Sequence, residues 1–161
     1  MTDSKDQDTV YRSGVRVPPP LIYAAVFACG YLLQKFLPVD DALPVAASRF
    51  VASLCAGAAA ILAAWSFGSF GRARTSALPI RPAAALVTDG PYRFTRNPMY
   101  VSLALLYAGL ALGFNVFWAL VLLPAAIAIM RFHVIAGEEH YLERRFGEEY
   151  LGYKARVRRW L

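Results

Sequence analysis

The sequence predicts an all-α integral membrane protein with about four transmembrane helices and a C-terminal amphipathic surface helix. Of its 161 residues, 58% are hydrophobic and only 17% are charged, whereas soluble globular domains contain about 25% charged residues. The apolar residues gather in four long runs, as helices of about 20 residues that cross a bilayer require. The net charge of +6 does not indicate nucleic-acid binding, because the basic residues flank the apolar runs.

The four apolar runs define the predicted spans. They are, in chain order, residues 21–37, 43–70, 99–112 and 116–135. The third and fourth runs are separated only by Gly113-Phe114-Asn115, so we expect a tight helical hairpin. Pro98 is tolerated at the start of the third helix, and Pro124 is expected to kink the fourth.

Basic residues set the predicted orientation. They concentrate in the connection 71–98, which contains the turn sequence Asp89-Gly90-Pro91, and in residues 136–161. The positive-inside rule then places both termini in the cytoplasm of a multi-pass protein of the plasma (inner) membrane. Residues 1–17 form a polar tail that does not resemble a cleavable signal peptide. Residues 136–161 have apolar residues every three or four positions, which is typical of a surface helix, and the whole chain is expected to be one domain.

Small residues recur at four-residue spacing, a pattern that lets membrane helices approach closely. They are Ala52, Ala56 and Ala60 in the second run, and Gly109 in the third run with Gly113 directly after it. Packing within the chain is favoured over a dimer interface, so we expect a monomer or a weak homo-oligomer.

Ionisable residues at the cytoplasmic ends of the hairpin are the candidates for chemistry, because an unpaired charge at membrane depth is costly. One group lies in residues 90–100, which enter the third run. The other leaves the fourth run and comprises Arg131, His133, Glu138, Glu139 and His140. The two open ends of a hairpin are neighbours, so these groups are expected to share one pocket. The alternative for any single residue is an interface anchor.

Several motifs in the C-terminal half resemble those of a known enzyme family. They are Leu86-Val87-Thr88-Asp89-Gly90-Pro91-Tyr92, Arg96-Asn97-Pro98-Met99-Tyr100, Glu138-Glu139 with Leu142, and Phe146-Gly147-Glu148-Glu149-Tyr150 with Tyr153. In this order and spacing they resemble the isoprenylcysteine carboxyl methyltransferase and phospholipid methyltransferase family of integral membrane enzymes. The resemblance implies methyl transfer from S-adenosylmethionine to a lipophilic acceptor at the cytoplasmic membrane face. The acceptor would be a lipid amine, a thiol or a prenylcysteine-like carboxylate.

The resemblance also implies a set of site residues. The expected cofactor-binding residues are Ala85, Leu86, Val87, Tyr92, Arg96, Asn97, Pro98, Met99, Tyr100 and Glu138. The catalytic candidates are His133, Glu139, Arg131 and Tyr100. Aromatic faces of Tyr92 and Tyr100 suit a sulfonium cation, and Arg96 suits the cofactor carboxylate. Glu138 is expected to accept hydrogen bonds from the cofactor's amino or hydroxyl groups.

Methyl transfer is an in-line displacement, so positioning in a dry pocket is expected to matter more than a nucleophilic residue. An amine or thiol acceptor must lose a proton, which His133, Glu139 or Tyr100 could assist. Two positions depart from the family pattern. Asn97 stands where histidine is common, and Val134 stands where prenylcysteine enzymes have an arginine for the substrate carboxylate. Arg131, one helical turn away, is the candidate to replace that arginine.

The alternative to methyl transfer is a non-catalytic membrane scaffold or small transporter subunit, although the span centres have few of the ionisable residues that transport requires. No metal site is expected, because the acidic and histidine residues after the fourth run lack HExxH and Glu-x-x-His spacing. The expected partners are a lipophilic substrate and membrane lipids.

Overall fold

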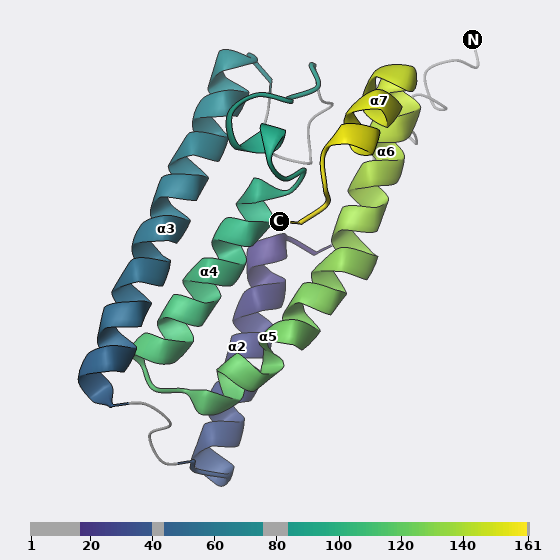
Figure 1. The fold of residues 1–161 in the computed structure, drawn as a ribbon. Coiled ribbons are helices and arrows are strands. Elements are labelled where there is room, and N and C mark those ends of the chain that lie inside the picture. Colours follow the sequence, from purple (N-terminus) through teal and green to yellow (C-terminus); the bar gives the residue numbers. More distant parts are fainter. Residues whose placement is uncertain (1–16, 40–43, 76–83, 161) are drawn as a thin grey trace. The chain divides into compact units, whose positions relative to one another are not determined.

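The computed structural model describes residues 17–39, 44–75 and 84–160, and its regular elements are helices (Figure 1). They are α2 (Pro19–Phe36), α3 (Val45–Arg72), η1 (Gly90–Arg93), α4 (Pro98–Gly113), α5 (Phe117–Ile129), η2 (Met130–Ile135), α6 (Ala136–Phe146) and α7 (Glu148–Arg156). The predicted all-α class is confirmed for these residues. Most of the polar N-terminal tail and part of the 71–98 connection lie outside them.

Two helical stretches are long and apolar enough to cross a membrane. One is α3, and the other is the continuous stretch Phe117–Phe146, which comprises α5, η2 and α6. Helix α4 is apolar but has only 16 residues, and α2 is not among the span-length candidates. Two span-length helices therefore support the prediction of a membrane protein. The count of four spans and the single domain remain predictions.

The described chain divides into two compact units. The four-helix unit comprises described residues of 17–63 and 99–130, and the polar unit comprises described residues of 64–98 and 131–160. Glycines allow close helix contacts in the four-helix unit. A Cβ added to Gly30 of α2 would lie 2.7 Å from the Cα of Ala119 in α5, and one added to Gly109 of α4 would lie 3.1 Å from the carbonyl oxygen of Ala52 in α3. Gly109 and Ala52 thus serve packing within the chain, as their spacing predicts.

Helices α4 and α5 form the predicted hairpin. Asn115 adopts a φ of +55° in the turn, a left-handed conformation that asparagine tolerates better than most residues. The Val116 N–H donates to the carbonyl of Ala111 at 2.8 Å. The Tyr107 hydroxyl donates to the carbonyl of Ala119 at 2.9 Å, which links the two helices one turn further along.

The helix that follows the turn changes its hydrogen-bond pattern at Met130, where the four-helix unit ends. Pro124 lies inside α5, and the six residues of η2 form a π-helix. A π-helix has a wider turn than an α-helix and so shifts the residues that face a neighbour; such turns are frequent near functional sites. Val134 and Ile135 are buried in this turn.

The C-terminal segment differs from the sequence prediction. Instead of one helix over 136–161, it forms α6 and α7 and then a non-helical stretch. Gly147 separates the two helices with φ +52° and ψ −127°, a conformation that glycine reaches because it has no Cβ. Beyond α7, Arg158 pairs with Thr95 in an isolated parallel β-bridge. The break at Gly147 is the physical reason why one continuous surface helix does not form.

Candidate functional site

A buried carboxylate in the polar unit contacts two arginines. Glu139 of α6 is only 6% exposed. Its Oε1 accepts a hydrogen bond from Nε of Arg159 at 2.9 Å, and its Oε2 accepts one from Nη2 of Arg159 at 2.5 Å. Nη2 of Arg96 lies 3.3 Å from Oε1 of the same carboxylate. Two guanidinium groups therefore share one carboxylate, so these three side chains together carry a net charge of +1.

Arg96 retains hydrogen-bonding capacity. Its side chain is only 9% exposed, yet its Nε and Nη1 have no hydrogen-bond partner within the described residues. Folded proteins rarely leave buried N–H groups unpaired, because the lost hydration is not replaced. Together with the excess positive charge, these donors make the cluster suited to an anionic group such as a carboxylate.

The residues just before α4 hold the C-terminal stretch in place. The Arg96 N–H donates to the carbonyl of Arg158 at 2.9 Å. The Thr95 hydroxyl and the Asn97 side-chain amide both donate to the carbonyl of Arg159, at 3.1 and 3.0 Å. The amide of Asn97, at the position where histidine is common in the family pattern, thus fixes the backbone of the arginine that binds Glu139.

The turn before this segment packs tightly against the end of α3. Gly90 has a φ of +60°, and an added Cβ would lie 2.5 Å from Oγ of Ser69 and 2.9 Å from Nε1 of Trp65. Two residues on, the ring of Tyr92 packs edge-on against Phe70, with ring centroids 5.5 Å apart. A glycine is therefore required for η1 to sit against α3 and place Tyr92.

The buried tyrosines of the polar unit include Tyr92, Tyr150 and Tyr153. The Tyr153 hydroxyl donates to the carbonyl of Tyr92 at 2.7 Å. Burial raises the pKa of Tyr92, and the nearby Tyr153 and Glu138 raise it further. Burial also raises the pKa of Tyr153. Burial and the Glu139 carboxylate together raise the pKa of Tyr150 to about 12, although Arg96 acts in the opposite direction. These phenols are neutral near pH 7 and act as hydrogen-bonding and aromatic groups.

The other predicted site residues have varied surroundings. In the polar unit, Val87 is buried, and Ala85, Leu86 and Glu138 are half-buried. Arg131 and His133 are exposed on η2, and the Arg131 guanidinium lies 5.5 Å from the ring centroid of Phe132.

Three more predicted residues lie at the start of α4. Pro98 is buried, whereas Met99 and Tyr100 are half-buried and belong to the four-helix unit. Among the predicted site residues, the structure brings Arg96 and Glu139 into contact, although they lie 43 positions apart in the sequence.

Four residues around this cluster were not among the predicted cofactor-binding or catalytic residues, although three of them belong to stretches that the sequence analysis singled out. They are Thr95, Tyr150, Tyr153 and Arg159. From the sequence, Arg159 is one of several basic residues that follow an amphipathic pattern. Gly147 is the sequence feature that could have indicated this contact, because a helix that ends there allows the later chain to return to Thr95.

Comparison with known proteins identifies the family. Residues 47–149 match phospholipid methyltransferases. The chain belongs to the phospholipid methyltransferase family. It is also 45% identical over 65 residues to an uncharacterised protein of Haemophilus influenzae, a stretch that covers 39% of this chain and all of that protein. No solved structure matches the chain.

The phospholipid methyltransferase match includes only part of the charged cluster. Arg96 and Glu139 fall within residues 47–149, whereas Tyr150, Tyr153 and Arg159 follow them. All of α2 precedes the matched residues. Arg159, which donates two hydrogen bonds to Glu139, therefore lies beyond the family match.

Proposed function

We propose that the protein transfers a methyl group from S-adenosylmethionine to a lipophilic acceptor at the cytoplasmic membrane face. Membership of the phospholipid methyltransferase family supports methyl transfer and a lipid-like acceptor. The observation that carries the cofactor assignment is the buried Arg96 side chain, whose Nε and Nη1 lack hydrogen-bond partners within the described residues.

The residues of the polar unit fit this cofactor chemically. Its amino-acid end carries a carboxylate, which suits an arginine with spare N–H donors in a cluster with excess positive charge. When bound, S-adenosylmethionine supplies an electrophilic methyl carbon, to which the acceptor's lone pair bonds as the carbon–sulfur bond breaks. We assign the carboxylate contact to Arg96. The backbone and side chains of Ala85, Leu86 and Val87 would contact the remainder of the cofactor.

Other residues divide into contact and positioning roles. Tyr92 and Tyr100 would offer aromatic faces to the sulfonium charge, and Glu138 would accept hydrogen bonds from amino or hydroxyl groups. Both carboxylate oxygens of Glu139 are engaged by arginines, Oε1 by Arg96 and Arg159 and Oε2 by Arg159. We therefore assign Glu139 to positioning Arg96 and Arg159. The exposed His133 would remain the group able to take a proton from an amine acceptor.

We further propose that α2, α3, α4 and the Phe117–Phe146 stretch all cross the inner membrane, with both termini cytoplasmic. The basic residues of the 71–98 connection and the C-terminal segment support this orientation. A cysteine added at either terminus, with Cys29 and Cys55 replaced by serine, should react with a membrane-impermeant maleimide only after cells are opened. Labelling of either terminus from outside in intact cells would contradict the topology.

The acceptor can be identified by transfer of a labelled methyl group. Purified protein, radiolabelled S-adenosylmethionine and native membrane extract should yield label in a lipid-soluble product. Arg96→Ala should reduce this incorporation, whereas Arg93→Ala, which alters an exposed arginine of the same turn, should not. Absence of label together with absence of cofactor binding would favour a non-catalytic scaffold.

A further inference from the structure

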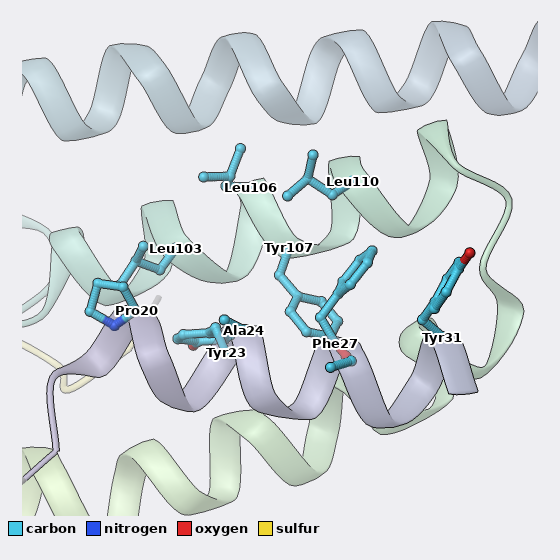
Figure 2. A pocket seen from close by; sticks show the side chains of 10 residues that line it. Pro20, Tyr23, Ala24, Phe27, Tyr31, Leu103, Leu106, Tyr107 and Leu110 are labelled. Atoms are coloured by element: carbon cyan, nitrogen blue, oxygen red, sulfur yellow. The ribbon is translucent and has the colours of Figure 1, made fainter. Parts of the chain in front are cut away.

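The unpaired donors of Arg96 are enclosed by protein. Its Nε and Nη1 are fully buried and have no hydrogen-bond partner within the described residues. A cavity of about 500 Å³ lies between α2 and α4 (Figure 2), but its lining is largely apolar, belongs to the four-helix unit and does not include Arg96. A ligand can therefore reach the Arg96 donors only if a segment next to this side chain moves.

The groups described around the Arg96 side chain come from the C-terminal part of the chain. Glu139 contacts it from α6. Burial raises the pKa of the Tyr150 and Tyr153 hydroxyls on α7, and the nearby charge of Arg96 opposes this rise. Beyond α7, the backbone passes alongside Arg96, whose N–H donates to the carbonyl of Arg158 at 2.9 Å. Residues 157–160, which we call the strap, are the yellow coil that leaves α7 in Figure 1.

The strap is held in place mainly by polar contacts. Each of its four side chains is at least partly exposed, whereas Tyr150 and Tyr153 anchor α7 with exposed fractions of only 1% and 5%. Three described hydrogen bonds join the strap backbone to residues 95–97, and Arg159 pairs with Glu139. Segments with few buried apolar contacts open at a lower free-energy cost than packed helices. The strap is therefore the part of this cover that can open while α7 stays in place.

The formal charges decide which state of the strap a carboxylate ligand favours. With the strap closed, Arg96, Arg159 and Glu139 together carry a charge of +1, and a bound carboxylate brings the sum to zero. With the strap open, Arg159 is withdrawn, so Arg96 and Glu139 sum to zero and the same ligand makes the sum −1. Charges also interact more strongly in a buried setting. A carboxylate therefore binds the closed state more tightly and shifts the population toward it.

We propose that the strap opens to admit the amino-acid end of S-adenosylmethionine to Arg96 and closes over it when the carboxylate is bound. Arg159 is the positioning residue of this device, because it latches the strap to Glu139. The inference rests on the proposed function, since the carboxylate is that of the cofactor. It adds a role for residues that follow the family match, which ends at residue 149.

Distances between two spin labels test the movement without any methyl transfer. The full chain, with Cys29 and Cys55 replaced by serine, carries labels at Arg144→Cys on α6 and Arg158→Cys on the strap. Both positions are exposed, and the contact described for Arg158 uses its backbone carbonyl. Saturating S-adenosylhomocysteine should increase the share of molecules at the closed-strap distance. 5′-Methylthioadenosine, which lacks the amino-acid carboxylate, should not.

Two substitutions of Arg159 separate its charge from its hydrogen bonds. Arg159→Lys keeps the charge of +1 but loses the planar pair of donors, and Arg159→Gln loses the charge as well. Both should increase the open share in the absence of nucleoside. S-adenosylhomocysteine should close the strap again in Arg159→Lys but not in Arg159→Gln. Arg156→Ala, at an exposed position at the end of α7, is the matched control and should behave like the unmodified protein.

Binding measurements separate latching from general support of the fold. Arg159→Gln should weaken S-adenosylhomocysteine binding by about tenfold, as is usual for coupling between a ligand and a conformational change. It should leave 5′-methylthioadenosine affinity nearly unchanged. Arg159→Lys should keep most of the affinity for S-adenosylhomocysteine. A merely structural role for Arg159 would instead weaken the binding of both nucleosides.

The strap and the proposed function fail through different results. One unchanged distance in the unmodified protein and both Arg159 variants, with and without S-adenosylhomocysteine, would overturn the strap. Equal closure by the two nucleosides would also overturn it. Neither result would contradict cofactor binding. Absence of binding by either nucleoside would contradict the proposed function and, with it, the ligand of the strap.

Discussion

The Arg159 guanidinium donates hydrogen bonds to both carboxylate oxygens of Glu139, at 2.9 and 2.5 Å, across 20 residues of chain. This contact links the C-terminal stretch to α6 and leaves Arg96 beside the same carboxylate at 3.3 Å. The hydrogen bonds to Glu139 also raise the pKa of Arg159, so this guanidinium stays charged. The cluster orders the C-terminal stretch and holds the Arg96 donors in a buried setting.

Removal of the Arg159 side chain is expected to destabilise the protein. In Arg159→Ala, the buried Glu139 loses its bidentate partner, which should lower the free energy of unfolding by about 2–3 kcal/mol. Thermal unfolding in mild detergent measures this change. Arg158→Ala is the matched control, because the contact described for Arg158 uses its backbone carbonyl. Equal unfolding temperatures for the two variants would contradict a stabilising role for the Arg159–Glu139 pair.

The turn at Gly90 gives a second prediction. Gly90→Ala forces a left-handed conformation on a residue with a Cβ, at about 1–2 kcal/mol, and adds the contacts with Ser69 and Trp65. It should lower the unfolding temperature. Gly152 lies at an exposed position in α7, with nothing within 4 Å of an added Cβ. Gly152→Ala should therefore stabilise the folded protein by up to about 1 kcal/mol. Changes of the same sign in both variants would contradict this account of Gly90.

Alkaline pH should weaken the fold through Tyr150. Its pKa is raised from 10.0 to about 12, so the folded state keeps the phenolic proton more tightly than the unfolded state does. The resulting stability is fully present below pH 10 and is lost as pH rises from 10 toward 12. Unfolding measured across this window, with tyrosinate absorbance as a second readout, should show a smaller decline in Tyr150→Phe. An identical decline in that variant would contradict the assignment.

How much the sequence could predict depends on whether an interaction is local. Apolar run length predicts α3 and α4 to within about two residues, and the short linker predicts the α4–α5 hairpin. The hairpin argument also predicts that the groups around Arg96 and Glu139 come together. The C-terminal stretch could not be placed, because its position depends on the Gly147 break and on hydrogen bonds from Thr95 and Asn97, residues more than 60 positions away.

Calorimetry with two nucleosides tests the central claim that Arg96 binds the carboxylate of the cofactor. S-adenosylhomocysteine carries the amino-acid carboxylate, whereas 5′-methylthioadenosine has the same adenosine and thioether without it. Arg96→Ala should weaken S-adenosylhomocysteine binding by about 10- to 100-fold, as expected for the loss of charge-assisted hydrogen bonds, and leave methylthioadenosine binding nearly unchanged. Arg93→Ala should alter neither affinity. Unchanged S-adenosylhomocysteine affinity in Arg96→Ala, or an equal loss for both nucleosides, would contradict the account.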